Sequence, residues 1–233
     1  QKSAQGLPKR KHAQVTRPEI ILRYDTKLRL AILLPHRPSP ALLALGQTYF
    51  DSNGDIKPNA NLEELMRQVE KNPEEITVYS DALDFINNDL ESQKMALREN
   101  ELCTLYANDQ WHPKLLQTEL LPYQVEGALF LAHRSRCILA DDMGLGKTIQ
   151  AMAAVELMAQ ERNLERVLVV TPASLKFQWV EEIRKFTSRQ VQVIDGSEKE
   201  RENAYSTPTF YRIVNYDVVK HDLLKLNAWE PDL

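Results

Sequence analysis

The stretch ADDMGLGKTIQA, residues 140–151, lies between an apolar run at 137–139 and a segment with helical periodicity that begins near Thr148. Gly144 and Gly146 can take backbone angles that other residues resist, so consecutive N–H groups can converge on an anion. The N-terminus of the following helix adds unpaired N–H groups and a partial positive charge. The pattern therefore predicts a phosphate-binding loop with a strand before it and a helix after it.

Lys147 and Thr148 have the side chains that phosphate chemistry requires. A lysine at this position reaches the β- and γ-phosphates of a nucleotide, and the threonine hydroxyl can be a ligand of Mg²⁺. The strict pattern G-x-x-x-x-G-K-[ST] requires glycine where the sequence has Asp141, and this departure argues against an ordinary GTPase. The alternative is a glycine-rich turn with a solvent-exposed lysine.

Residues 111–233 alternate between segments typical of strands and segments typical of helices. Such alternation predicts parallel βαβ units, with helices on both faces of a sheet. Continuous apolar runs fit this arrangement because parallel strands are buried on both sides. The expected strands are CILA (137–140), VLVVTP (167–172), VQVID (191–195) and FYRIVNY (210–216), and the expected helices are 148–160, 174–186 and 217–226.

Residues 1–110 have weaker patterns, with a polar and basic start that we expect to be a flexible arm at 1–17. Strands are expected in EIILRY, LRLAILL and ITVYS, a short helix from Asn61 to Val69 with Asn61 as its cap, and a long helix from about Ser80 to Ala107. The prediction is therefore an accessory α+β region at 18–110 that ends in a long helix, followed by an α/β domain at 111–233.

The composition is typical of a globular protein, with 43% apolar and 27% charged residues. No stretch approaches about 18 uninterrupted apolar residues, and the first residues lack the apolar centre of a signal peptide. Two cysteines are too few for a disulfide framework or a zinc site. We expect an intracellular protein, in the cytoplasm, nucleoid or nucleus, that does not interact with a membrane.

Charge is distributed unevenly along a chain whose net charge is −4. Residues 1–37 contain nine Lys/Arg and two Asp/Glu, whereas residues 51–110 contain five and fourteen. A basic arm of this kind is suited to contact with nucleic acid. A solvated charged segment is the alternative.

The segment LADDMGLGKTIQA, residues 139–151, resembles motif I of the Swi/Snf-type branch of superfamily-2 helicase-like ATPases. In that branch an acidic pair precedes Met-Gly-Leu-Gly-Lys-Thr, as Asp141 and Asp142 do here. The upstream segment LLPYQVEGALFL, residues 120–131, resembles the glutamine motif of the family, in which Gln124 would read the adenine edge. An amide can donate to adenine and accept from it together. Without motif I, the same segment would be interpreted as an amphipathic helix.

The resemblance implies ATP as the nucleotide and Mg²⁺ as its metal, with Lys147 and Thr148 in catalytic roles and Thr148 as the metal ligand. The implied fold is a P-loop RecA-like parallel sheet with helices on both faces, present as an incomplete lobe and preceded by the smaller α+β accessory region. The implied nucleotide-binding residues are Gln124, Asp142, Met143, Gly144, Leu145, Gly146, Lys147 and Thr148.

Two later segments resemble motifs Ia and Ib of the same family. VLVVTPASLKFQWVEEI, residues 167–183, resembles motif Ia, whose loop lies along a nucleic-acid strand, and YRIVNYDVV, residues 211–219, resembles motif Ib less specifically. Such contacts to phosphate position a protein without reading sequence. The residues implied to contact nucleic acid are Thr171, Ser174, Lys176, Asn215 and Tyr216. Ser174 is also suited to capping the helix that follows it.

The resemblance implies an ATP-dependent translocase or remodeller on double-stranded DNA, with residues 18–110 as a candidate surface for protein partners. No Asp is followed directly by Glu in the sequence, so the Asp-Glu-Ala-His motif of the family is not within it. We therefore expect the chain alone to be inactive in hydrolysis, and expect Asp232-Leu233 to begin a strand that leads into that motif. The alternatives are a non-hydrolysing nucleotide-binding or interaction module, and an RNA-directed helicase, against which DDMGLGKT argues.

Overall fold

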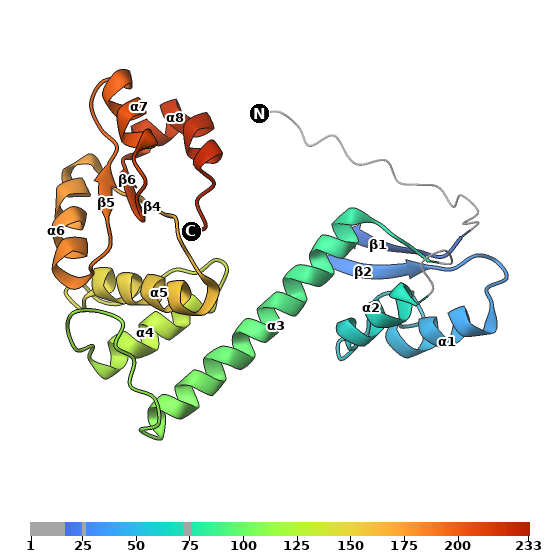
Figure 1. Cartoon of the computed structure of the whole chain (residues 1–233). Helices are drawn as coiled ribbons and strands as arrows, with labels where there is room; N and C mark the ends of the chain where they lie inside the picture. Colours follow the sequence, from blue (N-terminus) through green and yellow to red (C-terminus); the bar gives the residue numbers. More distant parts are fainter. Residues whose placement is uncertain (1–16, 25–26, 72–75) are drawn as a thin grey trace. The chain divides into compact units, whose positions relative to one another are not determined.

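The computed structural model describes residues 17–24, 27–71 and 76–233 (Figure 1). Nearly all of the arm expected at 1–17 lies outside these residues. The chain divides into two compact units, residues 1–94 and 95–233. Within the described part of the chain, no helix has both the length and the apolar character needed to cross a membrane.

The first unit contains a mixed sheet of three strands in the order β2-β1-β3. β1 (Glu19–Tyr24) pairs with β2 (Leu28–Leu33) in antiparallel register and with β3 (Thr77–Val78) in parallel register. The three strands expected in this region are therefore confirmed, although the third is shorter than ITVYS. The outer edge of β2 is covered, because Ile32 N donates to Gly54 O over 2.8 Å.

Two short helices, α1 (Pro40–Tyr49) and α2 (Leu62–Glu70), pack on this sheet. The expected cap of α2 is confirmed, since the Asn61 side chain accepts from Glu64 N over 2.9 Å. Sequence reasoning missed α1, because its prolines indicated only the end of the preceding strands. Proline is tolerated in the first helical turn, where its missing N–H would be unpaired in any case. Pro40 takes that position after the Ser39 cap.

The long helix α3 (Ser80–Ala107) has the bounds that the sequence predicted. Its first part belongs to the first unit, where Ala82 and Ile86 are buried in the core. Its second part belongs to the second unit, where Leu102 is buried in a different core. The division between compact units thus falls within a helix, whereas the domain boundary at 110/111 stays a sequence-based prediction.

In the second unit, charged side chains attach α3 to the two helices that follow it, α4 (Pro122–Ala132) and α5 (Lys147–Arg162). Arg98 Nε donates to Glu161 of α5 over 2.8 Å. Arg134, just after α4, donates to Glu99 over 2.7 Å. These pairs supplement the apolar contacts of Leu102 and fix the end of α3 to this unit.

The second unit is built on a parallel sheet, as the sequence predicted, and its strand order is β4-β6-β5. The strands are β4 (Val167–Val170), β5 (Val191–Val193) and β6 (Tyr211–Val214). Side chains of a strand alternate between faces. Tyr211 and Ile213 are therefore buried with α4, α5 and α6 (Lys176–Phe186), whereas Val214 is buried with α8 (Tyr216–Trp229). Helices cover both faces (Figure 1), which confirms the α/β prediction.

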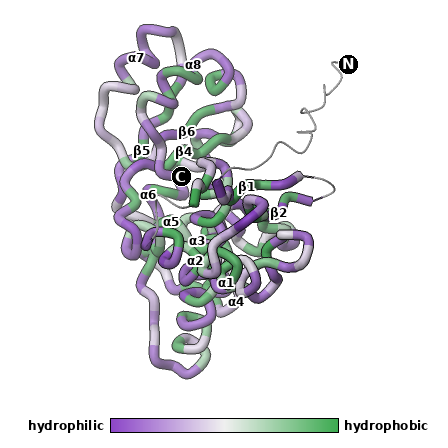
Figure 2. Tube along the Cα trace, turned by 90° about the vertical axis from the view of Figure 1, so that its right-hand side faces the viewer, coloured by the Kyte–Doolittle hydropathy of each residue, from purple (hydrophilic) through white to green (hydrophobic). Residues whose placement is uncertain are grey.

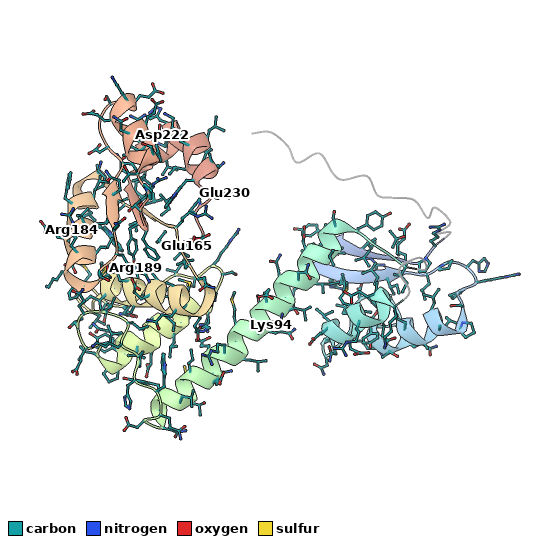
Figure 3. All side chains as sticks on the ribbon, in the orientation of Figure 1. Lys94, Glu165, Arg184, Arg189, Asp222 and Glu230 are labelled. Atoms are coloured by element: carbon teal, nitrogen blue, oxygen red, sulfur yellow. The ribbon has the colours of Figure 1, made fainter. Side chains whose placement is uncertain are left out.

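The buried Glu156 anchors α5 to the sheet. Arg189, labelled in Figure 3, donates to both carboxylate oxygens of Glu156, with Nη2–Oε2 at 2.9 Å. The guanidinium also lies 4.2 Å from the ring centroid of Phe210, just before β6. Hydrogen bonding to Glu156 raises the pKa of Arg189 above its ordinary value, so this arginine remains charged.

Sequence reasoning missed α7 (Glu198–Ser206), which has no buried residue and is coloured mostly as hydrophilic in Figure 2. Its signal is a capping box rather than apolar periodicity. Ser197 N donates to Glu200 Oε2 over 2.7 Å, and the Ser197 side chain accepts from Glu200 N. Arg201 then attaches the helix to Asp222 of α8, with Nε–Oδ2 at 2.6 Å.

The strand expected at 137–140 is wrong for this structure, because these residues form neither strand nor helix. Cys137 is exposed, and the Ile138 side chain is 85% exposed. A strand exists only when its backbone groups pair with a neighbour. The apolar run identified a segment suited to a sheet, but among the described residues none pairs with it in a ladder.

The last residues lie alongside β4. Leu168 N donates to Leu233 O over 2.8 Å. The Asp232 carboxylate accepts from Glu165 N and Arg166 N, at 3.0 and 2.8 Å, which lowers the pKa of Asp232. Residues 232–233 are thereby held against the segment that starts β4.

Candidate nucleotide-binding site

The loop before α5 has the backbone that the sequence predicted. Gly144 and Gly146 have φ values of 89° and 74°, in the left-handed region that favours glycine. A Cβ on Gly144 would have no atom within 4 Å, so this part of the loop opens to space. A Cβ on Gly146 would lie 2.8 Å from Gln124 Nε2. The backbone conformation therefore favours glycine at 146, and a side chain there would also displace the end of the Gln124 side chain.

Lys147 begins α5, and its ammonium turns back over the loop. Its Nζ donates to the carbonyl oxygens of Asp141 and Asp142, both at 2.8 Å. Two carbonyl dipoles leave the positive charge of the ammonium without a counter-charge, whereas phosphate oxygens would supply one as well as accept its hydrogen bonds. Thr148, half-buried, is the next residue of the helix. The geometry therefore fits a phosphate group at this helix N-terminus.

The other loop residues predicted to bind nucleotide do not direct side chains into one site. Asp142 is exposed, Met143 is 97% exposed, and Leu145 is also exposed. Their contribution to a phosphate site would come from backbone N–H groups, which are what a loop of this kind uses. Their roles as ligands stay predictions.

Gln124 lies beside the loop, so the structure brings the two predicted nucleotide segments together. Its side chain is 7% exposed on the first turn of α4. The amide oxygen accepts from Leu121 N over 3.0 Å, and Nε2 lies 3.5 Å from the Tyr123 hydroxyl. The amide oxygen thus has a partner within the protein, while Nε2 faces Gly146. Recognition of adenine by Gln124 stays a prediction.

Sequence reasoning missed Gln150 and Gly127, and it assigned no contact to the Asp141 carboxylate. Gln150 is fully buried, and its Nε2 donates to Asp141 Oδ2 over 2.8 Å and to Leu145 O over 3.2 Å. Gly127 of α4 leaves room for it, because a Cβ there would lie 1.7 Å from Gln150 Oε1. The available signal was Asp141 itself, an acceptor at a position where the strict pattern has glycine.

Lys176, predicted to contact phosphate, is 3% exposed in the structure. Its Nζ lies 2.7 Å from Asp195 Oδ2, just after β5. This hydrogen bond is the main cause of the lowered pKa of Asp195. The buried ammonium is therefore paired with a half-exposed carboxylate, and its burial does not support Lys176 as a nucleic-acid contact. The first turn of α6 directs this side chain inward.

Ser174 is exposed, within the short 3-10 helix Ala173–Leu175. Its predicted alternative role as a cap of α6 is wrong, since Leu175 precedes α6 and no side chain caps the helix. Thr171 is buried, and its N–H donates to Val214 O over 3.0 Å. Of the three residues in the segment that resembles motif Ia, Ser174 is the accessible one.

In the segment that resembles motif Ib, Asn215 caps α8, because its side chain accepts from Val218 N over 3.4 Å. Tyr216 is 58% exposed. Asn215 therefore has a structural role in this structure, while Tyr216 is accessible to a partner. Among the residues that the structure describes, no group of three or more His, Cys, Asp or Glu is arranged to hold a metal ion.

Comparisons with known proteins agree with the motifs. The model of a family described as the SNF2-related domain matches residues 63–229. The chain is 44% identical over 82 residues to the mouse DNA annealing helicase and endonuclease ZRANB3, a match that covers 35% of this chain and 7% of that protein. It is 35% identical over 124 residues to the chromatin remodeling factor mit1 of Schizosaccharomyces pombe, covering 50% of this chain and 8% of that protein. The chain thus spans less than a tenth of the length of these two relatives.

A solved structure is also similar, the Sulfolobus solfataricus SWI2/SNF2 ATPase core in complex with dsDNA. It is 30% identical, with a TM-score of 0.44, over 49% of this chain and 25% of that chain.

Proposed function

Because the chain belongs to the SNF2-related domain family, we propose that it is the nucleotide-binding part of an ATP-dependent translocase or remodeller of double-stranded DNA. The observation that carries this proposal is the approach of Gln124 to Gly146, which joins the glutamine motif and the phosphate loop in one site. The family match at 63–229 includes both segments. The relatives named as a DNA annealing helicase and a chromatin remodeling factor support DNA as the polymer acted upon.

Four groups would bind the nucleotide. Backbone N–H groups at Gly144 and Gly146 and the start of α5 would hold the phosphates. The Lys147 ammonium would exchange its two carbonyl partners for phosphate oxygens. The Thr148 hydroxyl would hold Mg²⁺, which neutralises phosphate charge. Gln124 Nε2, which lies next to Gly146, would donate to the adenine edge.

Of the residues predicted to contact nucleic acid, we keep in the proposal only those that are exposed. Ser174 and Tyr216 are exposed, whereas Lys176 and Asn215 are committed to an ion pair and a helix cap. A hydroxyl group is suited to bonding a phosphate oxygen, which positions a duplex without reading its sequence. Action on DNA implies an intracellular location in the nucleus or nucleoid.

ATP hydrolysis by the whole protein tests this function. We expect turnover to rise with double-stranded DNA, and the stimulation to fall with salt because phosphate contacts release counterions. Replacing Tyr216 with Ala should reduce the stimulation and leave basal turnover unchanged, with single-stranded RNA as the control polymer. Turnover that ignores duplex DNA, or that responds only to RNA, would exclude the proposal.

A further inference from the structure

Asp141 is held from two sides. Its carbonyl oxygen accepts from Lys147 Nζ, and its carboxylate accepts from Gln150 Nε2, both over 2.8 Å. Gln150 Nε2 also donates to Leu145 O over 3.2 Å. One buried amide therefore bonds to both ends of the loop, before Gly144 and after it. The acceptor at 141 explains the departure from glycine, since glycine offers no side-chain oxygen to this amide.

Burying the Gln150 amide removes it from water, which is unfavourable for its free energy. The side chain is fully buried, and Oε1 has no hydrogen-bond partner. A buried polar atom without a partner is unfavourable, and an apolar residue of the same shape would avoid it. Gly127 of α4 leaves the space that Oε1 occupies. Burial alone thus favours a residue other than glutamine, and the two bonds to the loop are the compensation.

We propose that Gln150 is a positioning residue of the nucleotide site, which with Asp141 holds the phosphate loop in its binding conformation before nucleotide arrives. The inference rests on the proposed nucleotide site and names the residues that order it. A loop fixed in advance loses less conformational entropy on binding. Gly127 has a supporting part, because a side chain there would displace Gln150.

Hydrogen exchange of the nucleotide-free chain tests directly whether Gln150 and Asp141 order the loop. In Gln150→Met, which has the same length and no donor, we expect the amides of residues 142–146 to exchange about tenfold faster, since local opening governs exchange. Asp141→Ala should have the same effect without altering the core, and it decides the question if Gln150→Met does not fold. Asp141→Asn keeps an acceptor oxygen and should retain wild-type exchange. Gln160→Met, at an exposed position of the same helix, is the matched control.

Titration with a fluorescent ADP analogue separates this inference from the proposed function. We expect Gln150→Met and Asp141→Ala to bind at least about fivefold more weakly, because a hydrogen bond to a charged group is lost. If the wild type binds nucleotide and this binding depends on Lys147, while both variants keep wild-type affinity and exchange, then Gln150 and Asp141 do not order the loop. The proposed nucleotide site would still hold. If the wild type binds no nucleotide, the proposed function is wrong. In that case, exchange that is unchanged in both variants would show that Gln150 and Asp141 do not order the loop either.

Discussion

At the scale of single residues, the two glycines of the phosphate loop share a backbone conformation but differ in the space around them. Both have positive φ values, but a Cβ would meet nothing at Gly144 and would meet Gln124 at Gly146. Sequence could predict that both positions need glycine for conformation. It could not predict the limited space at 146, because Gln124 is distant in sequence and meets the loop only in the folded chain.

Alanine substitutions should separate these two effects. Gly144→Ala is expected to lower the free energy of unfolding by about 1 kcal/mol, the strain of a left-handed residue. Gly146→Ala should lower it by about 2–3 kcal/mol, because Gln124 must also move and lose its bond to Leu121. Urea denaturation of both variants checks this. Equal losses would mean that the approach of Gln124 to the loop is not part of the stable fold.

Gln150 illustrates why site residues escaped sequence reasoning. It lies on α5 and belongs to an apolar face, so periodicity alone gives it no role. Its importance comes from Asp141 and Gly127, which three-dimensional packing brings to it. A polar residue at a core position, next to an unusual acid in a known motif, is the sequence signal that could have identified the pair.

At the scale of elements, patterns that depend on neighbours in sequence predicted well. The bounds of α3 and β1 follow from local periodicity, and Asn61 caps α2 through a residue three positions away. The segment at 137–140 failed, because strand formation depends on pairing with a distant backbone. Helix α7 was missed for a different reason, since caps and not apolar spacing define it.

The ion pair between Lys176 and Asp195 joins the first turn of α6 to the end of β5, and it predicts an asymmetry between its two partners. Asp195→Ala leaves the buried ammonium without a partner. This should lower the free energy of unfolding by about 2 kcal/mol, less than for a fully buried pair because Asp195 is partly exposed. Lys176→Met removes the buried charge itself and should cost much less. Chemical denaturation at neutral pH measures both variants.

The same pair gives a pH dependence with a definite sign. The pKa of Asp195 is lowered in the folded chain, mainly by the Lys176 hydrogen bond. Its contribution is therefore fully present above the ordinary aspartate pKa of about 4 and is lost as the pH falls through the lowered value. Wild type and Asp195→Ala should converge in stability in acid. Because Lys176 is buried, we expect Lys176→Met to keep the DNA stimulation of ATP hydrolysis. Loss of that stimulation in a variant of near-normal stability would show that Lys176 contacts nucleic acid.

At the scale of the whole molecule, each of the two compact units has its own main hydrophobic core, and the second unit has a further small cluster of Ile194, Val214 and Leu226. One core contains Ile20, Leu65 and Ile86, and the other contains Leu102, Met152 and Ile213. Separate cores can unfold separately, so we expect two thermal transitions rather than one. The domain boundary predicted near residue 110 and the division at 94/95 both give two units. They differ in the unit to which the second part of α3 and the few residues after it are assigned.

Nucleotide binding should raise the temperature of one of these two thermal transitions. A ligand that binds only the folded state stabilises its own unit by RT ln(1 + [L]/Kd), or about 2.7 kcal/mol at 100 times Kd. We therefore expect Mg²⁺-ATP to raise the transition of residues 95–233 and leave that of residues 1–94 unchanged in scanning calorimetry. An equal shift of both transitions would show that the two units unfold as one.

Lys147 is the residue of the loop that we assign to phosphate binding. Its Nζ has only two carbonyl oxygens of its own loop as partners in the described structure, and charge-assisted contacts to phosphate are each worth about 1.5–3 kcal/mol. Titration of a fluorescent ATP analogue should therefore give at least about tenfold weaker binding for Lys147→Ala. Lys199→Ala, at an exposed position on α7, should bind like the wild type. Equal affinities for wild type and Lys147→Ala would contradict the assignment of a nucleotide site to this loop.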